Sequence, residues 1–503
     1  MAGVTEVREL RPGLDAAEWA ELAGLAARAE SVEQAERAAR VKQPGLGAAE
    51  RVAQAEGPAR AEAAKGPSRV EQPRPIAVDW PGGRFSSPDR RRVVVTGLGV
   101  VSCIGIGPVE FAAGLRAGRS GVAPITAFDT AGYAHSNGCP VTGFDPADWV
   151  YHAPLPELGR ASRFAAAAAR MAVLDSGLAP AKLRAARCQI SIGTTDGESH
   201  DLDRLAAASV SAAPVSHDES ADSSSRLSRL ARRSRATRLS AAVAQELELP
   251  DAEVVTIGTA CSAGNYAIGN GLDAIRYGDA DFALCGGADA ICRKTFTSFY
   301  RLGTIAPDCC RPFDADRKGI LTGEGAGVLL LESLDSAVAR GARIYAEVLG
   351  YGLNCDAHHP VAPLGTSVAR CMALALEDAG VKSAEVDLIS AHGTGTKAND
   401  ATESRAIREV FGSAPPRTIS LKSMLGHSMG AASALGAAAC CLALTHGFIP
   451  PTINHERTDP DCGDIDCVPN TAVDAELGVV VNNGLAFGGN NAVVVLGKPE
   501  RMR

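Results

Sequence analysis

The chain has 503 residues, of which 46% are hydrophobic and 21% are charged. A single hydrophobic core stops growing at roughly 250 to 300 residues, so two core-sized halves or a duplicated fold are expected. This composition excludes a wholly disordered or fibrous chain. The formal net charge of −8 removes the broad attraction to phosphates that nucleic-acid binding needs, so no nucleic-acid partner is expected.

Residues 1–90 differ in composition from the rest of the chain. They are rich in Ala, Glu, Arg and Gln and end in a Pro- and Gly-rich linker. We expect a largely disordered or helical extension, and the pattern leaves both alternatives open. The first ten residues hold charges and no apolar stretch, which fits neither a secretory signal nor a typical transit peptide, so a cytoplasmic location is expected.

The longest apolar stretch and the cysteines both indicate a buried core. No stretch reaches the roughly 18 to 20 apolar residues that cross a membrane, and the best candidate, 431–444, is interpreted as a buried helix. The 14 cysteines include no Cys-x-x-Cys pair, which predicts reduced thiols rather than disulfides or a metal site. We therefore expect no membrane span and no bound metal.

Short apolar strands alternate with helices from residue 91 onward, which is typical of an α/β fold with buried strands. The first strand, 93–95, is expected to end in a glycine turn at 96–99. One series of elements spans 91–340 and a second spans 341–503. Both series repeat a plan of strand, reactive loop and helix, although no sequence repeat is visible.

Cys261 lies in the segment GTACSAG (258–264), after a predicted strand and before a helix predicted at 263–276. Such a turn of small residues presents a nucleophile at the start of a helix. Helix N-terminal amides favour a thiolate and can lower the pKa of a cysteine. Although any one of 14 cysteines is more often a small core residue, this context predicts that Cys261 is a nucleophile.

Two histidines occupy turns of the same kind. His392 lies in a glycine-rich loop after one predicted strand, and His427 lies between another strand and an alanine-rich helix. Lys422, five residues before His427, is costly to bury without a partner. Each histidine taken alone fits a hydrogen-bonded structural role, but the matching turns predict one shared site.

Six blocks of sequence follow one another in a specific order. They are VVVTGLGVVS, TACSAG, RPFDADRKG with LTGEGAGVLLLE, AHGTGT, SLKSMLGHSMGAA and LAFGGNNAVVVLG. With these blocks, residues 91–503 resemble the elongating β-ketoacyl-acyl carrier protein synthases, the ketosynthases of type II fatty acid and polyketide systems. The resemblance implies a thiolase-like duplicated α/β fold with five layers, α-β-α-β-α. It also implies a homodimer, or alternatively a heterodimer with a ketosynthase-like subunit.

The resemblance implies a role for each matching residue. Cys261 resembles the acylated nucleophile, and His392 and His427 resemble the pair that handles decarboxylation of the extender unit. The backbone N–H of Cys261 and that of the gate residue Phe487 would form the oxyanion hole. The other matching residues are Lys422, which supports the histidines, Glu403 as its charge partner, Asp400 beside it, and Thr394 and Thr396, which bind the phosphopantetheine arm.

The implied enzyme is an acyltransferase that performs a decarboxylating Claisen condensation. An acyl group on Cys261 would react with malonyl-acyl carrier protein to give β-ketoacyl-acyl carrier protein in fatty acid or polyketide elongation. Substrates would arrive on the 4'-phosphopantetheine of acyl carrier protein, and no bound cofactor is expected. The alternative is a non-elongating partner or scaffold subunit of a heterodimer, against which Cys261 argues. Leu485 and Asn399 depart from common family residues and leave the acyl specificity open.

Six arginines and no acidic residue occur between Arg226 and Arg238, a local charge of +6. Carrier proteins of the resembled systems are acidic, so this patch is predicted to dock them, with Arg229, Arg232 and Arg233 as the candidates. A solvated helix face or a dimer contact is the alternative.

Overall fold

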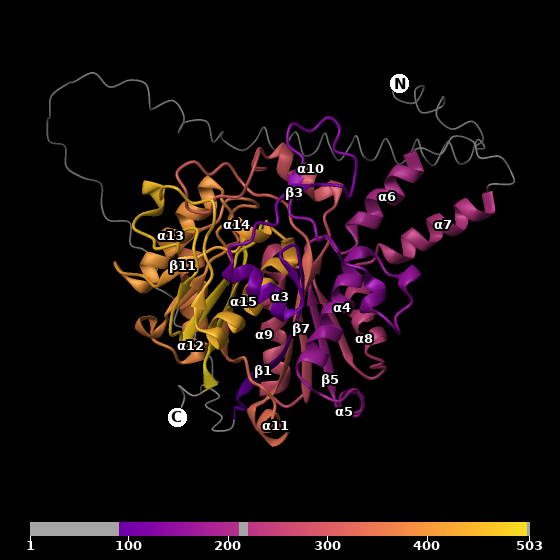
Figure 1. Ribbon diagram of the computed structural model, residues 1–503, viewed down its shortest axis with the longest axis horizontal. Coiled ribbons are helices and arrows are strands. Elements are labelled where there is room, and N and C mark those ends of the chain that lie inside the picture. The colour runs from indigo at the N-terminus through magenta and orange to yellow at the C-terminus, as the bar shows by residue number, and fades with distance from the viewer. Residues whose placement is uncertain (1–89, 211–219, 500–503) are drawn as a thin grey trace, which may run out of the picture. The chain divides into compact units, whose positions relative to one another are not determined.

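The computed structural model describes residues 90–210 and 220–499 (Figure 1). The extension predicted for residues 1–90, with its linker, lies outside the described residues except for its last residue.

Two series of strands build the main sheet. The first series comprises β1 (Val93–Ser102), β5 (Cys188–Gly193), β6 (Glu253–Ile257), β7 (Phe282–Asp289) and β8 (Gly325–Ser333). The second series comprises β9 (Ala346–Cys355), β10 (Leu388–Ser390), β11 (Arg417–Ile419), β14 (Val479–Gly484) and β15 (Asn490–Gly497).

Both series have the same topology. The strand order is β6-β5-β7-β8-β1 in the first and β11-β10-β14-β15-β9 in the second. In each series the first three strands in this order pair in parallel and the next two pairings are antiparallel. A short antiparallel pairing of β1 with β9 joins the series at the centre. The predicted duplication is therefore confirmed, although it shows in the topology rather than in the sequence.

The glycine turn predicted after Val95 is wrong, because β1 continues through it with a bulge between Val95 and Gly97. The glycines instead allow close packing of the helix α4 (Arg160–Asp175). A Cβ atom on Gly97 would lie 2.0 Å from the Ala172 carbonyl oxygen. These glycines therefore bring the helix backbone against the strand, a role that sequence periodicity does not distinguish from a turn.

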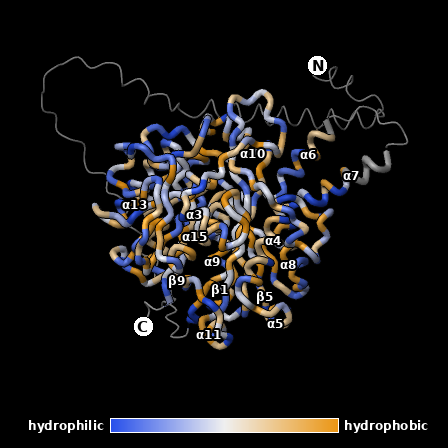
Figure 2. Tube along the Cα trace, viewed as in Figure 1, coloured by the Kyte–Doolittle hydropathy of each residue, from blue (hydrophilic) through white to orange (hydrophobic). Residues whose placement is uncertain are grey.

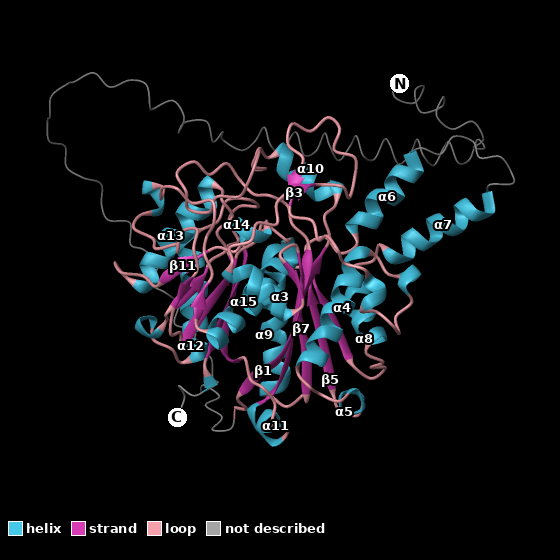
Figure 3. Cartoon of the chain, viewed as in Figure 1, coloured by secondary structure: helices cyan, strands magenta, loops and turns pink. Residues whose placement is uncertain are grey.

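Three hydrophobic clusters join the helices to the strands, and Figure 3 shows helices packed around both sets of strands. On the outer face of the first series pack α4 and α8 (Arg238–Glu246), and on the outer face of the second pack α12 (Gly365–Ala379) and α13 (Lys397–Phe411). Between the two series lie α9 (Ala263–Arg276) and α15 (Ala432–His446). This arrangement confirms the five-layer α-β-α-β-α fold.

Helix α15 contains the apolar stretch noted in the sequence. By length and composition Met429–His446 is long and apolar enough to cross a membrane, but 83% of this window is buried inside the protein. A glycine of α9 lets the two helices approach closely, because a Cβ atom on Gly264 would lie 2.6 Å from the backbone nitrogen of Ala434 in α15. The interpretation of this stretch as a buried core helix is confirmed.

The remaining described elements surround this framework. The helices are α3 (Pro108–Arg116), α5 (Pro180–Arg184), α6 (Ser199–Val210), α7 (Ser220–Arg233), α10 (Arg293–Arg301), α11 (Leu334–Ala339) and α14 (Lys422–Leu425). The short strands are β2 (Gly105–Ile106), β3 (Ala123–Pro124), β4 (Asn137–Gly138), β12 (Phe448–Ile449) and β13 (Val473–Asp474). Helices α6 and α7 project from one side (Figure 1). The coloured part of α7 is mostly hydrophilic (Figure 2).

Candidate active site

Cys261 occupies the turn between β6 and α9. A single 3₁₀ turn, Ala260–Ser262, connects the strand to the helix, and Ala260 adopts a left-handed φ of 54°. Such a φ is uncommon for a residue with a side chain and places Cys261 in a sharp bend. The second series repeats this arrangement, because Met429, with a φ of 50°, precedes α15 just as Ala260 precedes α9. The predicted strand, turn and helix are therefore present.

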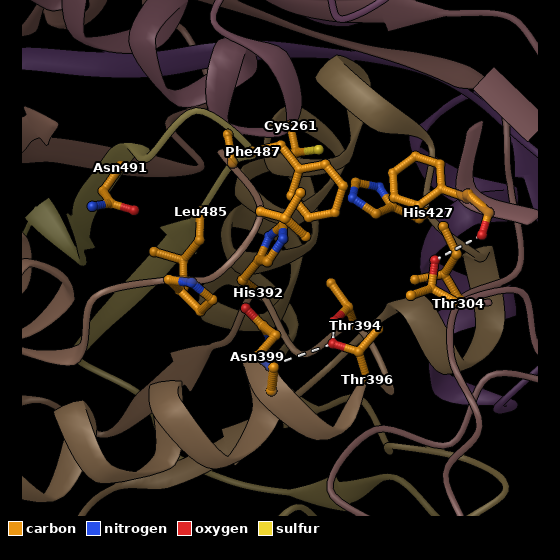
Figure 4. Close-up of a pocket in the computed structure, with 16 residues that line it drawn as sticks. Cys261, Thr304, His392, Thr394, Thr396, Asn399, His427, Leu485, Phe487 and Asn491 are labelled. Carbon is orange, nitrogen blue, oxygen red and sulfur yellow. Dashed lines mark hydrogen bonds between the residues drawn. The ribbon is translucent and has the colours of Figure 1, made fainter. Parts of the chain in front are cut away.

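The three predicted reactive side chains meet at one cavity. Cys261, His392 and His427 line a space of about 110 Å³, and the two imidazole centroids are 5.4 Å apart. Figure 4 shows the sulfur and both rings projecting toward this space from different turns. His392 follows β10 and His427 follows α14, so the duplicated topology brings residues together that are far apart in the sequence.

The resting Cys261 is a thiol. Burial raises its pKa to about 12, and the nearby Lys422 ammonium works in the opposite direction. The lowered pKa expected from the helix start is not found for Cys261, because removal of the sulfur from water outweighs the effect of the Lys422 charge. The thiol proton must leave as the acyl group is transferred.

Both histidines are neutral near pH 7. Burial, followed by the positive charge of Lys422, lowers the pKa of His392 and of His427 well below the usual 6.5. The Met429 N–H donates to His427 Nδ1 over 3.1 Å, so a neutral His427 carries its proton on Nε2. Lys422 Nζ lies 3.5 Å from His392 Nδ1, which favours the same tautomer for His392. Two N–H donors are thus available to one substrate oxygen.

Lys422 is buried and donates to the His392 carbonyl oxygen over 2.5 Å. Burial lowers the pKa of Lys422, and Glu403 is the strongest charge that opposes this shift. The Glu403 carboxylate, however, accepts hydrogen bonds from the backbone N–H groups of His392 and Gly393 at 2.7 and 2.8 Å. It also accepts from the side-chain amides of Asn483 and Asn399. Glu403 therefore supports the lysine electrostatically and holds the histidine loop directly.

Asp400, one helical turn before Glu403 on α13, holds the other half of this loop. Its carboxylate accepts the N–H groups of Thr394 and Gly395, and that of Phe313 from another loop. Burial raises the pKa of Asp400 to about 6, while Arg317, 3.6 Å away, opposes this shift. Two buried carboxylates on one helix thus fix the loop that carries His392.

Thr394, Thr396 and Phe487 lie at the same cavity, as the sequence predicts. The two threonine hydroxyl oxygens are 2.8 Å apart, and Thr396 caps α13. The Phe487 ring is 37% exposed and its centroid lies 5.3 Å from that of Phe299. Two hydroxyl groups and an aromatic pair suit a substrate arm that has both amide and apolar segments.

The cavity also contains residues that the sequence did not single out. They are Phe299, Thr304, Ile320, Val361, Pro363, Ala398, Ala486 and Asn491, together with Asn399 and Leu485, which the sequence noted only as departures. Phe299 and Thr304 belong to α10 and the loop after it, and no local motif marks them.

The structure separates the three predicted docking arginines. Arg229 and Arg232 are exposed on α7. Arg233 turns inward, with its side chain 12% exposed, and donates two hydrogen bonds to the buried Asp201 carboxylate. Arg233 therefore has a structural ion pair, whereas Arg229 and Arg232 are accessible to a partner.

A duplicated five-layer fold that carries a cysteine and two histidines on its strand-to-helix turns defines a condensing enzyme of the thiolase-like class. Residues 90–337 match the family model "Beta-ketoacyl synthase, N-terminal domain", and residues 345–456 match "Beta-ketoacyl synthase, C-terminal domain". The chain belongs to the β-ketoacyl synthase family, and it is an acyltransferase.

Curated relatives match the chain over most of its length. Nodulation protein E of Rhizobium sp. (strain N33) is 37% identical over 418 residues, 80% of this chain and 98% of that protein. The 3-oxoacyl-[acyl-carrier-protein] synthase 2 of Synechocystis sp. (strain ATCC 27184 / PCC 6803 / Kazusa) is 36% identical, over 82% of this chain and 99% of that protein. Among solved structures, "The ishigamide ketosynthase/chain length factor" has a TM-score of 0.78 and 59% identity, covering 81% of this chain and 99% of that one.

Proposed function

We propose that this enzyme condenses an acyl group, held on Cys261, with a malonyl group on acyl carrier protein, and releases carbon dioxide. The observation that carries this proposal is the convergence of Cys261, His392 and His427 on one cavity, with both imidazoles neutral. Relatives named as 3-oxoacyl-acyl carrier protein synthase and as polyketide ketoacyl synthase support it. The product is a β-ketoacyl-acyl carrier protein.

The first half-reaction is acyl transfer to Cys261. The sulfur attacks the thioester carbonyl carbon, and the backbone N–H groups of Cys261 and Phe487 stabilise the oxyanion, each worth about 3 to 4 kcal/mol. When the tetrahedral intermediate collapses, the bond from carbon to the carrier's sulfur breaks. The Cys261 proton ends on the departing carrier thiol. The step therefore converts the carrier thioester and the Cys261 thiol into a Cys261 thioester and a free carrier thiol.

The second half-reaction is decarboxylation and condensation. The Nε2–H groups of His392 and His427 donate to the thioester oxygen of the malonyl unit and stabilise the enolate that remains when carbon dioxide leaves. The enolate carbon attacks the acyl carbonyl on Cys261, a carbon–carbon bond forms, and the Cys261 sulfur departs as thiolate. One proton from solvent then restores the resting thiol. Lys422 favours this thiolate, because its charge lowers the pKa of Cys261.

Both substrates are proposed to arrive on the 4'-phosphopantetheine of an acyl carrier protein. Thr394 and Thr396 line the cavity beside Phe487 and offer two hydroxyl groups to the amides of that arm. One solved relative is titled as a type II polyketide acyl-carrier protein in complex with its ketosynthase, with 32% identity and a TM-score of 0.71.

The assembly and location follow from the same proposal. A homodimer in the cytoplasm is the primary expectation, and a heterodimer with a ketosynthase-like subunit is the alternative. The scaffold role is disfavoured because the chain holds a complete set of reactive side chains in one cavity. Release of carbon dioxide from malonyl carrier protein by the purified chain alone would support the catalytic role. No release, with or without candidate partner subunits, would support the scaffold role.

The histidines are expected to stay neutral at pH 6. Burial and Lys422 lower the pKa of His392 and of His427, so protonation should begin only well below pH 6.5. Selective ¹³C labelling of the histidine rings, with signals assigned by single substitutions, would report each protonation state by NMR. The same labelled protein unfolded in urea is the control, because both rings then titrate near pH 6.5. A folded-state midpoint at or above 6.5 for either ring would contradict the proposed donor role.

Carrier docking is proposed to use Arg229 and Arg232. Reversal of both to glutamate is expected to raise the Michaelis constant for carrier-bound acyl groups, because the acidic carrier loses attraction at this surface. Reaction with small pantetheine thioesters should remain unchanged. Arg370→Glu, on the exposed face of α12, is the control: it reverses a charge away from α7 and should leave the Michaelis constant unchanged. Equal loss with both substrate types, or the same effect from Arg370→Glu, would reject docking at α7.

A further inference from the structure

A second cavity, of about 160 Å³, lies apart from the active site between α4, α6 and α7. Its lining comprises Phe144, Pro146, Arg160, Arg163, His200, Arg204 and Arg233, none of which lines the active-site cavity. A cavity of about 10 to 15 Å³ can hold one water molecule. The present cavity is many times larger, so it has room for a small polyatomic ion. Four guanidinium groups from three helices surround it.

The charges around this cavity do not balance. Arg160 pairs with Glu324 through two hydrogen bonds, of 2.9 and 2.6 Å. A single carboxylate, Asp201, faces both Arg233 at 2.7 Å and Arg204 at 3.6 Å. Two carboxylates, Glu324 and Asp201, therefore pair with three of the four arginines. Arg163 is the arginine that pairs with neither.

Arg163 lacks a carboxylate partner among the described residues. One of its terminal nitrogens donates to the Leu155 carbonyl oxygen over 2.9 Å, while its Nε is buried without a hydrogen-bond partner in the described part of the chain. Burial and then the charge of Arg233 lower the pKa of Arg163, while Asp201 and Glu198 oppose this shift. A buried N–H donor without an acceptor is costly, and an anion in the cavity would offset the positive charge around Arg163.

The other titratable groups here do not remove the excess charge. Glu198 accepts the N–H groups of Ala161 and Ser162 at the start of α4. Burial raises its pKa to about 7, so it is only partly ionised at neutral pH. Burial also lowers the pKa of His200, which is therefore neutral. Even with Glu198 fully charged, four cations face three anions.

We propose that this cavity binds a phosphate-type oxyanion, either inorganic phosphate or a phosphate monoester, through Arg163 and Arg204. Planar guanidinium groups bind tetrahedral oxyanions with paired, charge-assisted hydrogen bonds. A recessed cavity with four arginines around it suits a small ion better than a broad protein surface does. This site goes beyond the proposed condensation and does not depend on it.

Binding is tested with the full chain in phosphate-free buffer at constant ionic strength. Isothermal titration with inorganic phosphate should give saturable binding, and Arg163→Gln should weaken it by about tenfold or more, because a charge-assisted hydrogen bond is lost. Arg204→Gln, at the exposed rim, should also weaken it. Arg370→Gln, on α12, should bind as the parent does. Glycerol 3-phosphate, with glycerol as its control, separates an ester site from one that takes only the free ion.

Thermal unfolding gives a second readout that a merely structural role would not produce. Phosphate should raise the melting temperature of the parent and not that of Arg163→Gln. Without phosphate, Arg163→Gln should melt at or above the parent temperature, because an uncompensated charge is removed. If Arg163→Gln fails to fold, Arg204→Gln decides the question.

Equal phosphate binding by parent and variants, or no binding of either phosphate, would overturn the proposal. If Arg163→Gln instead raised only the Michaelis constant for carrier-bound substrates, this surface would be a docking surface and the phosphate site would be rejected.

Discussion

Replacement of Cys261 by alanine should abolish condensation, with a loss of at least about 10³-fold, because the covalent route to the product disappears. Among the described residues that line the active-site cavity, Cys261 is the one that carries a thiol. The measurement is formation of β-ketoacyl-acyl carrier protein from acyl and malonyl carrier proteins.

Two further variants sharpen this result. Cys261→Gln should keep decarboxylation of the malonyl group while losing condensation, because its amide mimics the acylated cysteine. Cys355→Ala removes an exposed thiol and should condense at the parent rate. Condensation by Cys261→Ala at the parent rate would show that another residue carries the acyl group.

Loss of either active-site histidine should reduce condensation by on the order of 10² to 10³-fold, which is the effect of removing one oxyanion donor. Both rings are neutral and offer an Nε2–H, so neither can replace the other at a shared substrate oxygen. His392→Ala and His427→Ala should therefore release carbon dioxide slowly. Acyl transfer to Cys261 should suffer less, because backbone N–H groups stabilise its oxyanion.

His446→Ala is the matched control, since this histidine is exposed at the end of α15. It should condense at the parent rate. The readouts are carbon dioxide release and acyl-enzyme formation, measured separately for each variant. Normal decarboxylation in both His392→Ala and His427→Ala would exclude the donor role, and equal loss of acyl transfer would indicate a disturbed fold.

The reactive residues were predictable because local patterns mark them. Small residues around Cys261, and glycines around His392, permit the sharp turns that end a strand and begin a helix. The helix predicted at 263–276 is observed with the same bounds. A strand precedes it and the pair Tyr277-Gly278 follows it, and both mark its ends in the sequence. Such signals depend on near neighbours in the chain, which is why sequence reasoning found them.

The remaining features depend on residues that are distant in the sequence. The role of Gly97 becomes visible only where α4 crosses β1. The raised pKa of Cys261 follows from burial by several segments, which outweighs the charge of Lys422, a residue distant in the sequence. Phe299 enters the site from α10, without a motif of its own. Similarly, the arginines between 226 and 238 form one uniform pattern in the sequence. Only the structure shows that Arg233 differs from the others by its buried ion pair with Asp201.

The central claim is that Cys261 carries the acyl group during elongation. Its most direct test is mass spectrometry of the purified chain after incubation with acyl carrier protein that bears a defined acyl group. We expect a mass increase equal to that acyl group, located by peptide mapping on Cys261 and lost when malonyl carrier protein is added. An acyl group on a different residue, or none on the chain while condensation proceeds, would contradict the claim.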